Sequence, residues 1–299
     1  MRKLKILIYI GSFLLMLNTS QGQVFNKSSN KKNNLEQGFK SPPNEAKART
    51  WWHWISGNIS KSGITKDLEA MKAVGIQEAQ LFNVHLGFPK GGIRYLSEEW
   101  LDLFHFAATE AKRLDLELAF HNSAGWSSSG GPWVTPENAM QTVVFSEVIL
   151  DGGREFKNEI PKPKTKFDFY KDIAVLAFLK PKDSLKIDGL DYKILSNRIR
   201  NHLLPDTKEI SESAIIKKES IIDISSKLSK DGILEWKVPK GEWIILRIGH
   251  TANGQKNRPA VDGGRGLEVD KMSKKALDVY WEGGVQPILN KLGDLVGET

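Results

Sequence analysis

The chain has 299 residues, no cysteine and a formal net charge of +7. The lack of cysteine excludes disulfides, zinc thiolate sites and thiol nucleophiles, while the length suffices for one large or two medium domains. Three of the positive charges lie within the first five residues, and others lie in a polar segment over residues 26–40. Because these charges belong to terminal segments, the charge balance does not indicate a nucleic-acid partner.

The N-terminus has the pattern of a secretory signal peptide. Arg2, Lys3 and Lys5 precede an apolar run over residues 6–17, and the small residues Ser20 and Gly22 follow. A membrane anchor is the alternative, but a spanning helix needs roughly 20 apolar residues. We therefore predict a signal peptide over residues 1–22 and a secreted or periplasmic protein, surface association being open, with no integral membrane segment after cleavage.

The next segments alternate between predicted strands and helices. Residues 23–41 are rich in Asn, Ser and Lys and are predicted to be a disordered linker. Residues 49–55, 76–83 and 116–121 are β-prone. Between them, helices are predicted to begin at Ser62 or Thr65 and at Ser97, the first ending at Gly75. This alternation predicts a parallel sheet with helical crossovers over residues 42–138.

Two parallel architectures fit this alternation. A doubly wound sheet usually has a glycine-rich phosphate turn after its first strand, and none follows residues 49–55. A (β/α) barrel instead gathers polar and aromatic residues at the carboxyl ends of its strands, and His53, Asn83 and His121 occupy such positions. The barrel is therefore favoured.

The pattern changes after residue 139. Short β-prone runs separated by Gly, Pro and Asp occupy residues 142–150, 173–179, 187–195, 215–224, 233–238 and 243–248. They predict an inserted antiparallel β-rich segment over residues 139–252. Residues 253–299 then return to the barrel, with a helix from Ser273 interrupted near Gly283 and Pro287. The predicted fold class is α/β, a partial (β/α) TIM-type barrel whose closure is expected beyond Thr299.

Two aromatic and polar clusters are candidate ligand sites. Residues 51–54 read Trp-Trp-His-Trp, and residues 121–133 hold Ser, Gly and Trp in a loop. Aromatic faces stack on sugar C–H faces, and polar tips order hydroxyl groups. A packed core strand and a flexible linker are the respective alternatives. Strand alternation would place His53 and Trp54 on opposite faces.

A third cluster lies in the glycine-rich residues 253–270, which include Arg258, Asp262, Glu268 and Asp270. Carboxylates in such a loop can bind calcium or sugar hydroxyls, although the spacing does not match an EF-hand. Salt bridges between these charges explain the pattern equally well. Glu268 leads directly into the last predicted helix.

At these clusters the sequence resembles glycoside hydrolase family 106, the large bacterial α-L-rhamnosidases. The resemblance runs from about residue 42 to residue 299, and its motifs are collinear. They are residues 51–54, 57–59, 67–72, 125–126, 130–134 and 264–271. It implies a (β/α) barrel, carbohydrate as partner in the form of rhamnose-containing oligo- or polysaccharide, and hydrolysis of terminal rhamnose with inversion.

The resemblance also implies which residues bind sugar. The candidates for the sugar-facing wall are His53, Trp54, Asn83, His121, Asn122, Trp126, Trp133 and Glu268. The family's catalytic acid and base lie on later strands, so they are expected beyond Thr299, and this chain alone is expected to be inactive. Calcium is implied only by the resemblance. The alternative is a non-catalytic carbohydrate-binding or remnant protein without the acid and base.

Overall fold

The computed structural model describes residues 35–183 and 210–299. The predicted signal peptide and the predicted strand over residues 187–195 therefore lie outside the described residues. The chain divides into two units, residues 1–47 and residues 48–299. In the first, the described part of the predicted linker contains helix α2, Leu35–Lys40, and is followed by the 3-10 turn η1, Asn44–Ala46.

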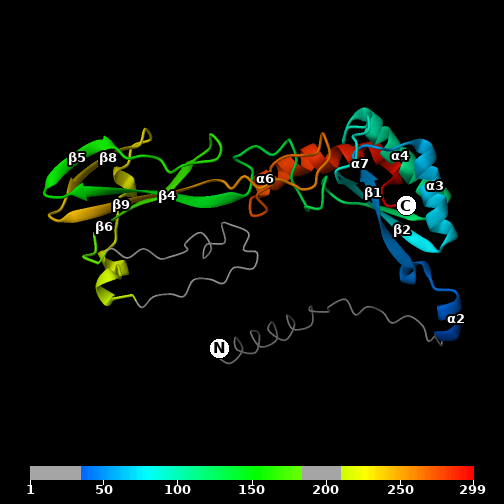
Figure 1. Cartoon of the computed structure of the whole chain (residues 1–299), viewed down its shortest axis with the longest axis horizontal. Helices are drawn as coiled ribbons and strands as arrows, with labels where there is room; N and C mark the ends of the chain where they lie inside the picture. Colours follow the sequence, from blue (N-terminus) through cyan, green and yellow to red (C-terminus); the bar gives the residue numbers. More distant parts are fainter. Residues whose placement is uncertain (1–34, 184–209) are drawn as a thin grey trace, which may run out of the picture. The chain divides into compact units, whose positions relative to one another are not determined.

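The second unit begins with a three-stranded parallel sheet. Strands β1 (Ala48–Ile55), β2 (Ile76–Val84) and β3 (Glu117–Phe120) lie in the order β1-β2-β3. Helices α3 (Lys61–Ala73) and α4 (Glu98–Arg113) connect them (Figure 1). The predicted parallel strand–helix alternation is confirmed.

Side-chain caps fix where the two helices start. Ser97 caps α4 as predicted, since its hydroxyl accepts from the backbone N–H of Trp100. The predicted start of α3 is wrong by a few residues, because Ser60 rather than Ser62 or Thr65 accepts from the N–H of Gly63.

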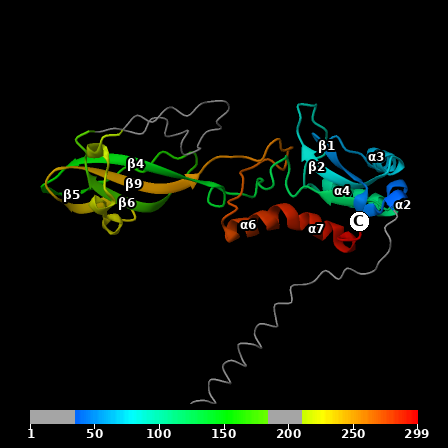
Figure 2. The same cartoon turned by 90° about the horizontal axis from the view of Figure 1, so that it is seen from below.

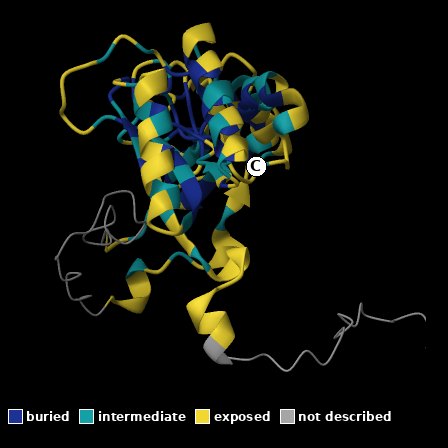
Figure 3. Ribbon diagram, turned by 90° about the vertical axis from the view of Figure 1, so that its right-hand side faces the viewer, coloured by how far each residue is buried: buried dark blue, intermediate teal, exposed yellow. Residues whose placement is uncertain are grey.

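The two helices cover one face of the parallel sheet. Trp52, Trp54 and Leu81 on the strands pack against Trp100 and Phe104 of α4, and all five are nearly fully buried. Figure 3 shows buried segments in the interior of this part of the molecule and exposed outer surfaces on its helices. Burying aromatic side chains of this size removes the largest apolar areas available to a protein from water. The helix-covered face is therefore the structural core of this sheet.

A separate antiparallel β-structure follows. A four-stranded sheet has the order β4-β9-β6-β7, formed by Gln141–Asp151, Glu242–Ala252, Lys171–Leu179 and Ile222–Asp223. Strands β5 (Arg154–Glu159) and β8 (Ile233–Val238) pair with each other. A core that includes Leu150, Val175 and Ile245 forms among these strands, packed with Leu234. The antiparallel β-rich segment is confirmed.

Two details of this segment differ from expectation. Residues 215–221 do not form the predicted strand, because 3-10 turns η2 (Glu212–Ala214) and η3 (Lys218–Ser220) precede the two-residue β7. Strand β5 was missed, since its sequence Arg-Glu-Phe-Lys-Asn-Glu has a single apolar residue. Only pairing with β8 gives it a strand's hydrogen bonds.

The described chain ends in one long interrupted helix. Helices α6 (Lys274–Tyr280) and α7 (Gln286–Leu292) flank the π-helical turn η5 (Trp281–Val285), followed by the short turn η6 (Gly293–Leu295). Figure 2 shows α6 and α7 continuing into each other. A Cβ on Gly283 would lie 2.4 Å from the ring of Trp133, so glycine there lets Trp133 pack against this turn.

The molecule is thus a mixed α/β protein. Its parallel strands do not close on themselves within residues 35–183 and 210–299, so the barrel remains a prediction. No helix in those ranges combines the length and apolarity needed to cross a bilayer.

Candidate functional site

The uncovered face of the parallel sheet carries rings from three strands or their ends. The His53 and Phe82 rings lie 5.6 Å apart, and the Phe82 and His121 rings stack at 4.6 Å. Trp126 meets His53 edge-on at 6.5 Å, and Trp51 lies 5.1 Å from Phe82. The direct pairing of His53 with Phe82 in the β1–β2 register explains why these rings adjoin.

The two histidines of this face differ in their polar contacts. His121 Nδ1 lies 3.0 Å from the carbonyl oxygen of Ser123, which can only accept, so Nδ1 carries the proton. In this tautomer, Nε2 of His121 is the acceptor of the ring. His53 Nε2 is buried and has no hydrogen-bond partner. A buried polar atom without a partner costs free energy, so His53 Nε2 is a candidate ligand contact.

Trp126 joins this face to a cavity of about 750 Å³. Its indole is 53 % exposed, so a flat apolar surface is available to a ligand. The cavity's lining contains aromatic, amide, cationic and acidic side chains together with a serine, a methionine and a glycine. Its residues are Trp126, Ser127, Met140, Lys166, Asn253, Gly254, Gln255, Lys256, Arg258 and Glu268.

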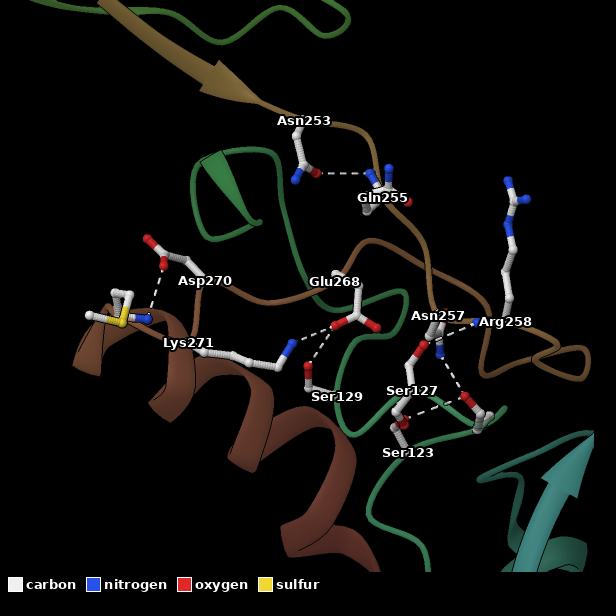
Figure 4. Close-up of polar contacts among 12 residues, drawn as sticks. Ser123, Ser127, Ser129, Asn253, Gln255, Asn257, Arg258, Glu268, Asp270 and Lys271 are labelled. Carbon is white, nitrogen blue, oxygen red and sulfur yellow. Dashed lines mark hydrogen bonds and ion pairs between the residues drawn. The ribbon is translucent and has the colours of Figure 1, made fainter. Parts of the chain in front are cut away.

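Glu268 contributes a buried carboxylate to this cavity. Its Oε2 accepts hydrogen bonds from the Ser129 hydroxyl at 2.9 Å and from Lys271 Nζ at 2.8 Å. Its Oε1 is buried and has no partner. Figure 4 shows both contacts converging on one oxygen while the other remains free. Glu268 therefore keeps an unused acceptor at the buried Oε1, while Ser129 and Lys271 hold Oε2.

A fully buried asparagine, Asn257, holds the loop that carries two of the cavity's cations, Lys256 and Arg258. Asn257 donates to the carbonyl oxygens of Ala124 at 3.0 Å and Gly264 at 2.7 Å, and accepts from the N–H of Gly266 at 2.8 Å (Figure 4). Gly125 has φ of 87°, and a Cβ there would lie 2.9 Å from the carbonyl carbon of Arg258. Glycine therefore permits the close approach of the two loops.

Tyr280 lies behind the carboxylate. It donates a hydrogen bond to the carbonyl oxygen of Asn122. Burial, and secondarily the negative charge of Glu268, raise the pKa of Tyr280 to about 12. Tyr280 is therefore a neutral donor at physiological pH. Its hydrogen bond anchors the backbone of the 121–133 loop at Asn122.

The ring cluster and the cavity therefore bring exposed aromatic faces close to polar and charged side chains. The chain matches the alpha-L-rhamnosidase family, glycoside hydrolase family 106, over residues 40–185 and 194–299. The chain belongs to this family.

Two longer proteins are similar to this rhamnosidase-family chain. It is 74% identical over 265 residues to a Formosa agariphila protein named "Putative beta-glucuronidase", covering 89% of this chain and 23% of that protein. It is similar to the solved rhamnosidase of Novosphingobium sp. PP1Y, with 28% identity and a TM-score of 0.69, over 87% of this chain and 38% of that one. The chain thus spans less than half the length of either relative.

The structure of the rhamnosidase-family chain gathers some of the predicted site residues. His53, His121 and Trp126 lie on one ring cluster. Glu268 lines the cavity that includes Trp126. The backbone of Asn122 meets Tyr280.

Three other predicted residues lie elsewhere. Asn83 is buried on the helix-covered face, where its Oδ1 accepts from Trp100 Nε1 at 2.9 Å. Trp54 is buried on the same face and meets Trp100 edge-on. Trp133 packs against the π-helical turn. Their contacts are those of core residues. Trp54 and Asn83 were selected because they lie at strand ends, and Trp133 because it lies in a loop rich in Ser and Gly.

The structure adds residues that sequence reasoning did not select. Lys166 enters the cavity from the antiparallel segment, far from Glu268 in sequence. Lys256 and Gln255 line it from the glycine-rich loop. Phe82 forms the centre of the ring cluster. Strand alternation could have indicated Phe82. It is adjacent to Asn83 in β2, so its side chain lies on the opposite face of the sheet.

The described carboxylates do not fit the calcium site that the family resemblance implies. Asp262 pairs with Lys90 at 2.7 Å, and Glu268 pairs with Lys271 at 2.8 Å. Asp270 Oδ1 accepts from the N–H of Met272 at 3.0 Å. Within the two described ranges, no three His, Asp or Glu side chains gather as metal ligands. We therefore assign calcium no role at these residues.

Proposed function

We propose that the polypeptide containing this chain is a secreted glycoside hydrolase that removes terminal α-L-rhamnose from polysaccharides, with inversion at the anomeric carbon. The observation that carries the proposal is the family match across both the parallel sheet and the antiparallel segment. The cavity supports it, because the exposed face of Trp126 and the free oxygen of Glu268 suit a sugar ring and its hydroxyls.

The arrangement of the parallel sheet supports the proposal that it belongs to a (β/α) barrel. Its helices cover one face, while the opposite face carries the rings of His53, Phe82 and His121. Barrel enzymes bind substrate at the carboxyl ends of their strands. We propose that later strands of the same polypeptide continue this sheet and bring the catalytic groups to the cavity.

The proposed reaction needs two carboxyl groups. One protonates the glycosidic oxygen as the bond from the anomeric carbon breaks. The other takes a proton from the water that attacks this carbon, and the two stand roughly 6.5–9.5 Å apart. Glu268 is assigned neither part, since Ser129 and Lys271 already engage one of its oxygens. Its part is to accept a hydrogen bond from a sugar hydroxyl.

The test uses the protein encoded by the complete reading frame that contains residues 1–299. It is incubated with p-nitrophenyl α-L-rhamnoside and p-nitrophenyl β-D-glucuronide in parallel, and NMR follows the first-formed anomer. We expect release from the rhamnoside with inverted configuration. Release from the glucuronide alone would instead support the activity in the name of the Formosa agariphila relative. Retention of configuration would overturn the proposed mechanism.

A second candidate function is non-catalytic carbohydrate binding. The exposed indole of Trp126 beside a buried, partly unpaired carboxylate favours binding without requiring catalysis. Titration calorimetry with methyl α-L-rhamnoside separates the two functions: binding without release from either aryl glycoside supports this candidate. Absence of both binding and release would overturn both.

A further inference from the structure

We propose that the cavity beside Glu268 binds an acidic saccharide unit, one that bears a carboxylate or a sulfate group. The inference rests on the proposed function only in taking the ligand to be a saccharide. It adds that the glycan presents an anionic unit next to the surface of Trp126.

The charges of the cavity lining are unbalanced. Lys166, Lys256 and Arg258 line it, and Glu268 is the acidic residue among its lining residues. The charge of Glu268 is already met by Lys271, whose Nζ lies 2.8 Å from its Oε2. The three lining cations therefore create a positive field that favours an anionic ligand.

Two of these cations have no carboxylate partner within the described parts of the chain. By contrast, Lys90 pairs with Asp262 and Lys271 pairs with Glu268, two acids of the glycine-rich segment over residues 253–270. Lys256 and Arg258 form no such pair, and both are exposed. Figure 4 shows the Arg258 guanidinium extended away from the polar contacts around it. A guanidinium can bind a carboxylate or sulfate through two parallel hydrogen bonds.

The backbone that carries the two cations is fixed before any ligand arrives. Asn257, between them, is fully buried and makes three hydrogen bonds to neighbouring loops. Arg258 accepts at its carbonyl oxygen from the N–H of Trp126 at 3.0 Å, and its own N–H reaches the Ser127 hydroxyl at 3.3 Å. Preorganisation lowers the entropic cost of binding, and it ties the cations to the stacking surface of Trp126.

The lining also distinguishes an acidic sugar from a simple anion. The free Oε1 of Glu268 needs a donor, which a sugar hydroxyl supplies and an unprotonated phosphate does not. The indole of Trp126 suits a ring with C–H faces. One ligand that carries hydroxyls, a C–H face and an anionic group satisfies all of these surfaces, whereas a neutral sugar leaves Lys256 and Arg258 without a counter-charge.

The experiment compares three glycosides that differ at one position. Titration calorimetry on the same full-frame protein measures Kd for methyl β-D-glucuronide, methyl β-D-glucoside and methyl β-D-glucoside 6-sulfate. We expect at least one anionic glycoside to bind about tenfold tighter than the neutral one, since hydrogen bonds to charged groups contribute this order of affinity. The ranking of glucuronide and sulfate identifies the preferred anion.

The variant Lys256→Ala/Arg258→Ala should abolish this discrimination. The matched control Lys227→Ala/Lys230→Ala removes two exposed lysines of the antiparallel segment that do not line the cavity, and it should keep the discrimination. If the double variant melts at a lower temperature than the wild-type protein, the single variant Arg258→Ala provides a second test and should reduce the preference for the anionic glycosides.

Equal affinity for all three glycosides, or a preference that survives the Lys256→Ala/Arg258→Ala change, would overturn the inference. Calorimetry does not require turnover. A wild-type protein that prefers the anionic glycosides but does not hydrolyse the rhamnoside would therefore count against the proposed function alone. Intact rhamnoside hydrolysis without any anion preference would count against this inference alone.

Discussion

Glu268 shows how a single buried carboxylate can be both anchored and available. Ser129 and Lys271 hold one oxygen, and the other faces no protein donor. Burial makes an unpaired acceptor costly, because water no longer solvates it. A ligand hydroxyl that donates a hydrogen bond to this oxygen would remove that penalty. Glu268 would then contribute more to the binding free energy than the small area of its side chain suggests.

The variant Glu268→Gln should weaken saccharide binding. The amide oxygen would stay with Ser129 and Lys271, and the NH2 group, a donor, would replace the unpaired acceptor Oε1, so we expect the Kd for the neutral methyl β-D-glucoside to rise about tenfold. Calorimetry with the wild-type protein as reference measures the change. As a control, Asp278→Asn makes the same chemical change in an exposed ion pair with Lys274, whose lysine and aspartate side chains are 87% and 55% exposed. An unchanged Kd in Glu268→Gln would show that the carboxylate does not contact the ligand.

Asn83 illustrates the opposite case, a polar residue at a strand end that belongs to the core. Its Oδ1 accepts from the indole of Trp100, and both side chains are buried. In Asn83→Ala the indole N–H would lose its partner, so we expect the free energy of unfolding to fall by about 1–3 kcal/mol.

Urea denaturation followed by tryptophan fluorescence measures this loss. The variant Asn58→Ala is a suitable comparison, because Asn58 is exposed and bonds only backbone carbonyls, those of Ile55 and Pro89. A larger loss in Asn58→Ala than in Asn83→Ala would contradict the structural assignment of Asn83.

At the scale of elements, one buried arginine joins strands β6 and β9. Arg247 is 2% exposed, and its Nε and Nη2 reach the two oxygens of Asp172 at 2.8 Å each. Its Nη1 donates to the carbonyl oxygen of Ile160 at 2.7 Å, which links the sheet to the segment after β5. Each arm of the guanidinium thus has an acceptor, as a buried charge requires.

Replacing Asp172 with Asn should destabilise the protein more than replacing Arg247 with Met. Asp172→Asn leaves a buried cation without its counter-charge. We expect the free energy of unfolding to fall by about 2–3 kcal/mol, less than for a fully buried pair because Asp172 is 38% exposed. Arg247→Met removes the charge together with its desolvation cost and fills similar volume. Chemical denaturation of both variants tests the order, and the reverse order would contradict it.

The same pair sets a pH dependence. Hydrogen bonding from Arg247 lowers the pKa of Asp172. A lowered folded pKa stabilises the protein above the unfolded value of about 3.9, and this contribution is lost as pH falls toward the folded value. The stability difference between wild type and Asp172→Asn should therefore be full at pH 7 and shrink below about pH 4.

At the scale of the whole molecule, the parallel sheet has two unpaired edges among the described residues. Strands β1 and β3 each pair on one side only. The uncovered face between them exposes Trp51 at 62%, and the antiparallel sheet exposes Phe145 at 50% and Val143 at 61%. Unpaired strands and exposed apolar side chains promote association with other chains.

We therefore expect the 299-residue chain by itself to associate in solution. Size-exclusion chromatography with light scattering at several concentrations measures its mass. We expect species larger than a monomer, with a proportion that increases with concentration. A monodisperse monomer with one cooperative melting transition would show that these edges and faces are covered within the chain.

The sequence by itself determined the parallel strand–helix alternation, the antiparallel segment, the cap at Ser97 and the family. These features depend on local periodicity, on capping chemistry and on collinear motifs, all of which are readable along the chain. It also indicated His53, His121, Trp126 and Glu268, because each is a chemistry-bearing residue at a strand end or in a glycine-rich loop.

Only the tertiary structure decided how these residues combine. Alternation predicts that His53 and Trp54 point oppositely, but the packing of α4 decides which face is covered and therefore places Asn83 with Trp100. Lys166 joins Glu268 through the fold and not through spacing. The free oxygen of Glu268 and the unpaired charges of Lys256 and Arg258 depend on which partners the fold brings near, because desolvation and ion pairing are properties of three-dimensional neighbours.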